Sequence, residues 1–216
     1  MSLGVIIQAR MGSKRLPGKV MMDICGRPLL WHVIRNARKA VENVIVATPD
    51  KSIAQYAEEQ GVRSFIGSEE DVLDRYYQCA VRYDVDPIIR ITADNPLVDT
   101  EMVKSLIDFW HKGHYDWAAN CRLKVTYPIG NDVEVFSFKS LERAWCETTD
   151  PQDNDCVTSY IYHHPEMFKL GVMTSPENLS HLRWTVDTQE DLDHVRCIFE
   201  KRLQGVELVD MLCGKV

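Results

Sequence analysis

The sequence predicts an α/β fold in which a mostly parallel, mixed sheet is flanked by helices in a Rossmann-like arrangement. Two features lead to this prediction: short apolar runs rich in β-branched residues, and segments between them that carry apolar residues at helical spacing. Strands that alternate with helices of this length form right-handed βαβ units. Hydrophobic residues make up 45% of the 216-residue chain, enough for one sizeable core. We therefore expect residues 1–216 to form a single domain.

The first half of the chain shows this alternation most clearly. Its apolar runs predict strands at residues 3–8, 43–48, 62–67 and 87–92. The segments after these runs predict helices at residues 28–40, 52–60, 71–83 and 100–112. Pro28 suits the first position of a helix, and Gly61 and Gly113 suit positions just after a helix end. Because ligands bind beyond the carboxyl ends of parallel strands, the loops after the first and fourth strands are expected to open onto one crevice.

The second half of the chain is less regular. Its apolar patterns predict strands at residues 115–120, 132–138 and 182–186. Its helical patterns predict helices at residues 139–148, 153–163 and 189–203. Residues 115–165 depart from the alternation of the first half. We therefore expect them to form a subregion that binds sugar or contacts a second subunit.

Composition narrows the class of protein. The net charge of −7 argues against a protein that coats nucleic acid. The seven cysteines are an odd number, are scattered, and include no C-x-x-C pair, which suits a reducing cytoplasm better than a disulfide framework. No apolar run approaches 18 residues, and the first residues lack the basic region of a secretory signal. We therefore expect a cytoplasmic protein without a membrane span.

The loop after the first strand, "RMGSKRLPGKV" at residues 10–20, is similar to a Walker A loop with two changed positions. Gly18 and Lys19 fit the G-x-x-x-x-G-K-[ST] pattern, but Ser13 replaces its first glycine and Val20 replaces its magnesium-binding hydroxyl. Four cations fall within ten residues of this acidic chain: Arg10, Lys14, Arg15 and Lys19. The loop therefore predicts an anion site that is not an ATPase or GTPase loop. The alternative is a solvated basic loop.

Two acidic residues directly follow apolar strands. Asp94 follows the run at 87–92 and precedes Asn95-Pro96, and Asp187 follows the run at 182–186. Strand-end carboxylates can hold Mg²⁺ when the substrate supplies the remaining oxygens. The alternatives are local: Asp94 can form an Asx-turn, and Asp187 or Thr188 can cap the last helix with Glu190 or Asp191 as a capping-box partner. Asp99 is the expected cap of the helix at 100–112.

Several segments together resemble the sugar-acid cytidylyltransferases. This family includes the enzymes that activate deoxy-octulosonate and acylneuraminate as CMP-sugars, and the resemblance is greatest to its branch named for spore-coat polysaccharide biosynthesis. The matching segments are residues 6–40, 46–52, 67–80, 90–103, 127–145 and 183–195, in this order. The resemblance covers residues 4–203. Its most specific part is the Q-A-R-M-G-S-x-R-L-P-G-K opening.

The resemblance implies a fold, a reaction and a set of site residues. The fold would be that of the nucleotide-diphospho-sugar transferases, which is GT-A-like. The reaction would be Mg²⁺-dependent transfer of CMP from CTP to a sugar, with release of pyrophosphate, in polysaccharide biosynthesis, by a homodimer. Catalysis would depend on Arg10, Lys19, Asp94 and Asp187, with Asp94 and Asp187 as metal ligands. The nucleotide would be bound by Ala9, Arg10, Gly12, Ser13, Arg15, Lys19, Ala47, Thr48, Ser68 and Asp71, and the sugar by Asp132.

The sequence also departs from this family. Where the branch reads R-E-H-V-T, this chain has Asn154-Asp155-Cys156-Val157-Thr158, so a basic and an imidazole group are missing. Ala93 stands where the family has glycine. Three alternatives therefore stay open. They are a sugar 1-phosphate nucleotidyltransferase that uses another nucleotide, a glycosyltransferase, and a nucleotide-binding protein without turnover. The glycosyltransferase alternative lacks its usual D-x-D motif, because Asp94-Asn95-Pro96 does not match it.

Overall fold

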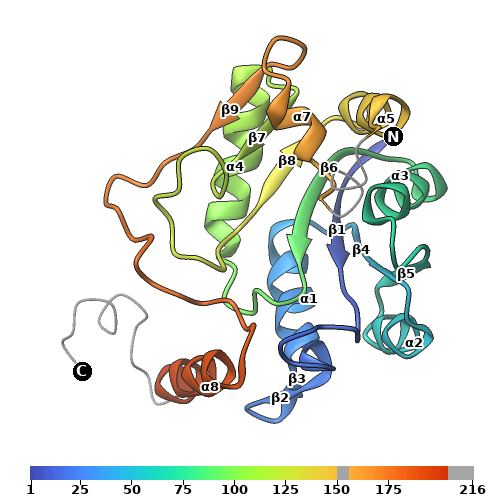
Figure 1. Cartoon of the computed structure of the whole chain (residues 1–216). Helices are drawn as coiled ribbons and strands as arrows, with labels where there is room; N and C mark the ends of the chain where they lie inside the picture. Colours follow the sequence, from blue (N-terminus) through green and yellow to red (C-terminus); the bar gives the residue numbers. More distant parts are fainter. Residues whose placement is uncertain (150–155, 204–216) are drawn as a thin grey trace.

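The computed structural model describes residues 1–149 and 156–203. Within these residues, seven strands form one sheet in the order β5-β4-β1-β6-β8-β7-β9 (Figure 1). The strands are β1 (Ser2–Gln8), β4 (Val44–Thr48), β5 (Arg63–Ile66), β6 (Val85–Thr92), β7 (Trp117–Ala119), β8 (Glu134–Phe136) and β9 (Leu170–Val172). Strands β5, β4, β1 and β6 are parallel, β8 is antiparallel to both β6 and β7, and β9 is parallel to β7. The expected mostly parallel, mixed sheet is confirmed.

Helices cover both faces of this sheet. They are α1 (Leu29–Ala40), α2 (Lys51–Glu59), α3 (Val72–Tyr83), α4 (Thr100–Gly113), α5 (Phe138–Glu147), α7 (Ser159–His163) and α8 (Gln189–Leu203). Alternate side chains of β1 point to opposite faces of the sheet, as in any β-strand. Val5 and Ile7 pack in one core with α1, α2, α4 and α8, and Ile6 packs in the other with α3, α5 and α7. None of the described helices has the length and apolar character needed to cross a membrane.

Several predicted boundaries are wrong. The strand expected at 182–186 is only a single parallel bridge between Arg183 and Ile129. Trp184 and Val186 are buried, so the apolar run reflects packing rather than a strand ladder. The helix expected at 153–163 is shorter: residues 153–155 lie outside the described residues, 156–158 form a turn, and α7 occupies Ser159–His163.

Three short strands were not expected from the sequence. Strand β9 adds three residues to the edge of the main sheet. Strands β2 (Asp23–Ile24) and β3 (Arg27–Pro28) form a small hairpin whose turn places Gly26 at a φ of 82°. Pro28 therefore ends β3 and precedes α1, rather than opening the helix as expected. These strands are too short to show the alternation on which strand prediction depends.

Backbone hydrogen bonds bring three separate segments to the carboxyl end of the central strands. Ala93 N donates to Gln8 O at 2.9 Å, which joins the ends of β6 and β1. Val186 N donates to Asp94 O at 2.9 Å, which joins the chain before α8 to the end of β6. The loop at 9–18 leaves β1 at the same edge. The expected crevice at this end of the sheet is therefore built from segments as far apart in the chain as Asp94 and Val186.

Candidate functional site

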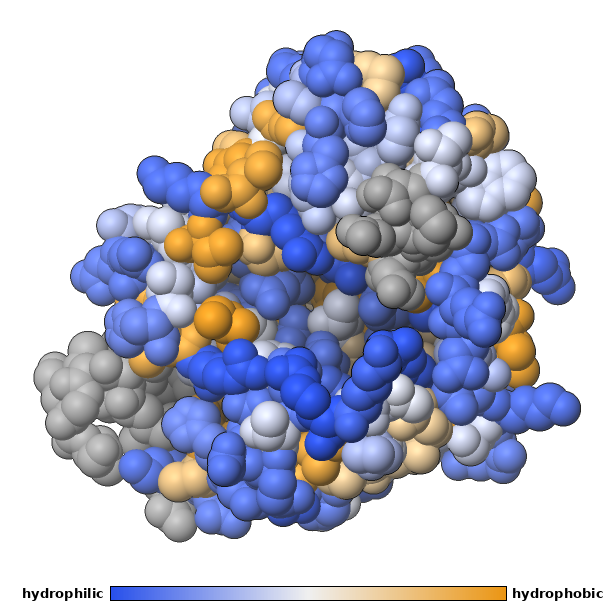
Figure 2. Space-filling view, viewed as in Figure 1, coloured by the Kyte–Doolittle hydropathy of each residue, from blue (hydrophilic) through white to orange (hydrophobic). Residues whose placement is uncertain are grey.

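A cavity of about 420 Å³ lies at this edge of the sheet. Figure 2 shows a hollow in the centre of this face, with strongly hydrophilic residues along its rim. The lining residues are Gln8, Ala9, Arg10, Ser13, Lys14, Arg15, Lys19, Val20, Val72, Arg75, Thr92, Ala93, Asp94 and Asp187. All four cations of the 10–20 loop are among them. Lys19 is buried, whereas Arg10, Lys14 and Arg15 are exposed and line the cavity, so the loop gathers its four cations around one hollow of the surface.

The backbone of this loop folds back on itself and directs Lys19 inward. Ser13 N and Gly18 N both donate to Met11 O, each at 2.9 Å. Gly18 has a φ of 73°, a left-handed conformation that glycine adopts without strain. Lys19 then begins a 3₁₀ helix, η1 (Lys19–Met21), and its side chain is only 9% exposed. The second half of the loop therefore serves to bury one lysine.

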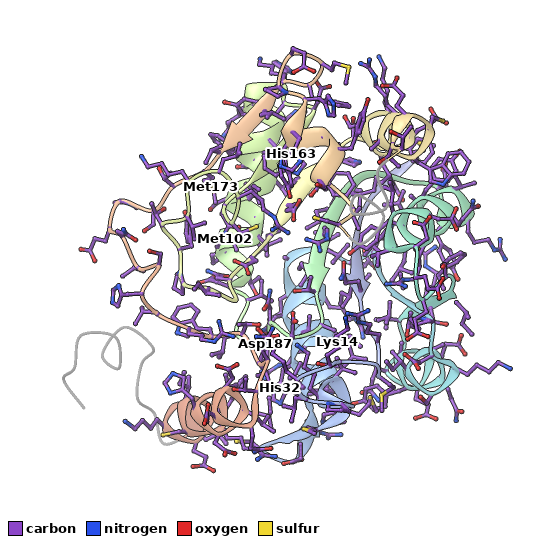
Figure 3. All side chains as sticks on the ribbon, viewed as in Figure 1. Lys14, His32, Met102, His163, Met173 and Asp187 are labelled. Carbon is purple, nitrogen blue, oxygen red and sulfur yellow. The ribbon has the colours of Figure 1, made fainter. Side chains whose placement is uncertain are left out.

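The Lys19 ammonium group connects the two strand-end acids. It donates to Asp94 Oδ2 at 2.9 Å, to Asp187 Oδ1 at 2.9 Å and to Val186 O at 2.7 Å. An ammonium group has three donors, so all of them are used. Asp94 and Asp187 thus approach the same positive centre, as the strand-end positions predicted. Figure 3 shows Lys14 and Asp187 close to one another at the carboxyl ends of β1 and β6.

Asp187 is the most heavily paired carboxylate of the site. Besides Lys19, it contacts Arg15 Nη2 at 2.9 Å and Arg183 Nη2 at 2.8 Å. Burial acts to raise the pKa of Asp187, but the hydrogen bonds and charges of these three cations outweigh it and hold the pKa below its ordinary value. Asp187 is therefore ionised at neutral pH.

Capping of the last helix does not use Asp187. Thr188 Oγ1 accepts a hydrogen bond from Asp191 N at 3.2 Å, and Asp191 Oδ2 accepts one from Thr188 N at 3.0 Å. This reciprocal pair is a capping box. Asp99 similarly caps α4 by accepting from the N–H groups of Glu101 and Met102. The Asp187 side chain is thus free of a capping role and faces the cations of the cavity.

Asp94 and Asp187 supply the kind of oxygens that a magnesium ion shared with a substrate would need, although the Lys19 ammonium group contacts both of them in this structure. Carboxylate oxygens are the ligands that Mg²⁺ prefers, and the two groups already converge on one cation. Among the described residues, no group of three or more His, Cys, Asp or Glu side chains could hold a metal by itself. A metal here would therefore need further oxygens from a bound phosphate or from water.

The structure divides the other predicted site residues into two groups. Ala9, Arg10, Ser13 and Arg15 line the cavity with Lys19. Gly12, Ala47, Thr48, Ser68, Asp71 and Asp132 are outside its lining. Asp71 Oδ1 accepts from Asp74 N at 2.7 Å and caps α3, and Ser68 Oγ accepts from Asp71 N at 2.9 Å and so holds the capping residue. The predicted contact of Ser68 and Asp71 with the nucleotide would be a second role, in addition to these hydrogen bonds at the start of α3.

Arg75 is a cavity residue that the sequence analysis missed. It lies on α3, is 1% exposed and donates from Nη1 to Ser68 O. Within the described chain, its buried Nε has no hydrogen-bond partner. Burial lowers the pKa of the Arg75 guanidinium, with a smaller contribution from Arg10. One sequence feature could have revealed it: Arg75 interrupts the apolar face that Val72 and Tyr76 share.

Asp132 lies beside the cavity, in the loop between β7 and β8. Its Oδ2 accepts from Gly130 N at 3.3 Å. Burial raises the pKa of Asp132 to about 6; the Gly130 hydrogen bond and Arg122 oppose this, and the negative charges of Asp94 and Glu134 add to it. This carboxyl group therefore titrates closer to neutrality than an ordinary aspartate.

The raised pKa of Asp132 predicts a pH-dependent effect on stability. A raised folded-state pKa contributes stability below the ordinary value of 3.8, and this contribution is lost as the pH rises through about 6. We expect Asp132→Asn to raise Tm by about 2–6 °C at pH 7.5 and to change it little near pH 4. Asp108→Asn, at an exposed position of α4, is the control and should show a flat difference. A Tm difference for Asp132→Asn that does not vary with pH would contradict this assignment.

Comparison with known proteins decides the family. Residues 4–209 match the family model described as cytidylyltransferase. The chain belongs to this family. It is 34% identical to the spore coat polysaccharide biosynthesis protein SpsF of Bacillus subtilis, over 91% of this chain and 85% of that protein. It is also 36% identical to a 3-deoxy-manno-octulosonate cytidylyltransferase of Lawsonia intracellularis, over 48% of this chain and 43% of that protein.

A solved structure shares the fold of this cytidylyltransferase. It is a cytidylyltransferase from Leptospira borgpetersenii, with a TM-score of 0.86, 31% identity, and coverage of 93% of this chain and 87% of that one. The predicted family and the Rossmann-like nucleotidyltransferase fold are both confirmed. The homologues include sugar-acid CMP-transferases, so the alternative of a glycosyltransferase is not favoured.

Proposed function

We propose that this cytidylyltransferase transfers CMP from CTP to a sugar acid and releases pyrophosphate. The observation that carries the proposal is the cluster of Lys19, Asp94 and Asp187 in a cavity that is also lined by Arg10, Lys14 and Arg15 of the same loop. Such a cavity offers positive charge for a polyphosphate and two carboxylates for a metal. The relative named for 3-deoxy-manno-octulosonate supports a sugar acid as acceptor, and the relative named for spore-coat polysaccharide supports a role in polysaccharide biosynthesis.

Attack of a sugar hydroxyl on the α-phosphorus needs in-line positioning and neutralised charge more than covalent help. In the proposed complex, Arg10, Arg15 and Lys19 bind the triphosphate and stabilise the leaving pyrophosphate, helped by N–H groups near Gly12 and Ser13. Lys19 exchanges one of its three present acceptors for a phosphate oxygen. Lys14 lines the same cavity and adds a fourth positive charge.

Asp94 and Asp187 would hold Mg²⁺. A bound Mg²⁺ supplies charge neutralisation at the α-phosphate and lowers the pKa of a nearby hydroxyl. The two aspartates therefore orient their oxygens toward the phosphates, while Lys19 and Arg183 fix the positions of these carboxylates.

The nucleoside is proposed to lie along the other side of the cavity. Ala9, Ala47 and Thr48 lie near the base, and Ser68 and Asp71 near the base or ribose. Arg75 supports this placement, because its unpartnered Nε is a donor that a base or ribose oxygen can satisfy. Asp132 is proposed to face the sugar.

Pyrophosphate release from a substrate panel tests the proposed function. The protein is incubated with CTP, UTP, GTP or dTTP, with Mg²⁺, and with sugar acids or sugar 1-phosphates. We expect release with CTP and a sugar acid. Release with another nucleotide and a sugar 1-phosphate would replace the proposal with the alternative nucleotidyltransferase. Thermal stabilisation by CTP without any pyrophosphate would indicate a nucleotide-binding protein without turnover.

Substitution of Lys19 tests the role of the loop. Lys19→Met removes the ammonium group and keeps the length of the side chain. We expect the KM for CTP to rise by about 10- to 100-fold, because a charge-assisted phosphate contact is lost, while the KM for the sugar changes by less than about twofold. Lys39→Met, at an exposed position of α1, is the control. An equal rise in both KM values for Lys19→Met would mean that this lysine positions the site as a whole and does not bind the nucleotide.

We also propose that the enzyme is a homodimer and that residues 115–165 contribute to the contact. Sedimentation equilibrium of the full chain gives the mass directly. A single species at the mass of one 24.9 kDa chain across the concentration range would reject the dimer.

A further inference from the structure

A buried cluster of charged and polar groups lies beside the cavity and has no role in the reaction described above. Its centre is Glu134 of β8, whose side chain is 1% exposed. Glu134 Oε1 accepts from Arg90 Nη1 at 2.6 Å and from Arg122 Nε at 3.4 Å. Glu134 Oε2 accepts from Trp117 Nε1 at 3.0 Å and from the Thr158 hydroxyl. One carboxylate therefore serves two guanidinium groups.

The two arginines differ in how fully their donors are used. Arg90 is buried, and its Nε and Nη2 both donate to Gln8 Oε1, at 3.2 and 3.1 Å. The positive charge of Arg90 therefore lies between Glu134 and Gln8, and Gln8 lines the cavity. Arg90 is the fixed base of the cluster, because each of its three guanidinium nitrogens donates to Gln8 or Glu134.

Arg122 is poorly satisfied by comparison. Among the described residues its one carboxylate contact is that with Glu134 at 3.4 Å, and its Nη2 faces the sulfur of Cys156 at 3.9 Å, which is a weak acceptor. In the part of the chain that the structure describes, Nη1 has no partner. The Arg122 side chain is 35% exposed, so the unused edge of its guanidinium can be reached from solvent. Tyr162 lies at one face of it, with the guanidinium carbon 5.8 Å from the ring centre.

Arg122 is linked to the cavity through a chain of contacts: it contacts Glu134, Glu134 contacts Arg90, and Arg90 donates to Gln8, which lines the cavity. Arg122 and Asp132 both belong to the loop between β7 and β8, and the charge of Arg122 acts on Asp132 together with that of Asp94. Because Arg122 is joined to the cavity through these contacts and is not among the residues that line it, a ligand at Arg122 is better placed to be the acceptor than the triphosphate of the nucleotide.

The neighbours of Arg122 also limit the charge of its ligand. A carboxylate matches the guanidinium fork with two oxygens and brings one negative charge. A phosphate monoester would bring nearly two negative charges beside Glu134 and Asp132, and this repulsion disfavours it. The surroundings are therefore suited to a monoanion.

We infer that Arg122 binds the carboxylate of a sugar-acid acceptor and makes the enzyme prefer acceptors with a single negative charge. Glu134 holds the guanidinium through Nε, and Cys156 and Tyr162 border its remaining edge. The inference rests on the proposed function and deepens it, because it assigns the acceptor class to one residue. It also supplies a cation beside Cys156, in the stretch where this chain lacks the basic and imidazole groups of its branch.

Direct binding tests this assignment without turnover. N-acetylneuraminate and 3-deoxy-manno-octulosonate are each titrated calorimetrically, as the acid and as its methyl ester, into the protein with CMP present. We expect the wild type to bind an acid more tightly than its ester. In Arg122→Gln the Kd of this acid should rise by about 10- to 100-fold, while that of the ester barely changes, so that the preference disappears. Lys124→Gln removes an exposed charge from the same loop and should keep the preference.

Three results would overturn the inference: an equal loss of affinity for acid and ester in Arg122→Gln, no binding of either acid to the wild type, or tighter, Arg122-dependent binding of glucose 1-phosphate. Arg122→Lys keeps the positive charge next to Glu134 and serves as the test variant if Arg122→Gln does not fold. We expect its affinity for the acid to fall by roughly 3- to 10-fold and its affinity for the ester to stay unchanged, because lysine lacks the two-pronged guanidinium group. Pyrophosphate release decides the proposed function separately. In turnover, the KM for the acid should rise with the KM for CTP unchanged.

Discussion

Asp187→Asn is expected to lower kcat/KM for CTP by about 100- to 1,000-fold while the protein stays folded. Asp187 Oδ1 lies within 2.9 Å of both Lys19 Nζ and Arg15 Nη2, so this carboxylate sets the positions of two cations that we propose to bind the triphosphate. It is also one of the two proposed metal ligands. Asparagine keeps the shape but removes the negative charge, and both roles depend on that charge. Initial rates of pyrophosphate release measure the effect.

The control for this prediction is Asp191→Asn. Asp191 shares Arg183 with Asp187, since Arg183 Nε lies 2.7 Å from Asp191 Oδ1, but it makes no contact with Lys19 in the described structure. We expect Asp191→Asn to lower Tm through its cap and ion pair and to keep kcat/KM within about threefold of the wild type. Titration of Mn²⁺ in the presence of CTP adds a readout of metal affinity. Full activity together with unchanged Mn²⁺ affinity in Asp187→Asn would reject the metal pair.

The sequence predicted the main part of this site because the ends of strands are set by local sequence patterns. The alternation of apolar runs and helices implied a parallel sheet, and a parallel sheet brings its carboxyl ends to one edge. Asp94 and Asp187 were expected to meet there, and the Lys19 ammonium group contacts both. Asp187 reached this position although the strand predicted before it is wrong, because one hydrogen bond from Val186 N to Asp94 O fixes the same end of that segment.

The parts that could not be predicted depend on contacts between distant segments. Arg90 was visible as a lone cation inside an apolar strand, and such a residue requires a buried acceptor. Nothing in the local pattern indicates that Glu134, 44 residues later, supplies it. The pairing follows from the register of β6 with β8, in which Arg90 and Glu134 are direct partners. Strand β9 was missed for the same reason: its three residues form a strand only because β7 provides an edge.

Glu134→Gln is expected to lower the free energy of unfolding by about 3–5 kcal/mol, the largest stability effect that we predict. Within the described part of the chain, removing the negative charge leaves Arg90 buried without an anionic partner and weakens the one carboxylate contact of Arg122. Burial acts to raise the pKa of Glu134, but Arg90, Arg122 and two hydrogen bonds lower it below the ordinary 4.5. The stability from this carboxylate is therefore present above about pH 4.5 and is lost on acidification below it. Guanidinium unfolding at neutral pH, followed by circular dichroism, measures the difference.

Glu101→Gln gives the matched control, because Glu101 forms an ion pair with Lys104 in which both side chains are largely exposed. Its cost should stay below about 1 kcal/mol. The double variant Arg90→Gln/Glu134→Gln separates charge from shape: removing both charges should recover part of the loss, since the amide groups can hydrogen-bond one another and no unpaired ion is buried. A cost for Glu134→Gln as small as that of Glu101→Gln would show that the β6–β8 contact does not depend on this ion pair. If the Arg90–Glu134 ion pair did not fix the Glu134 carboxylate, Glu134 would not hold the Arg122 guanidinium in place for the proposed acceptor.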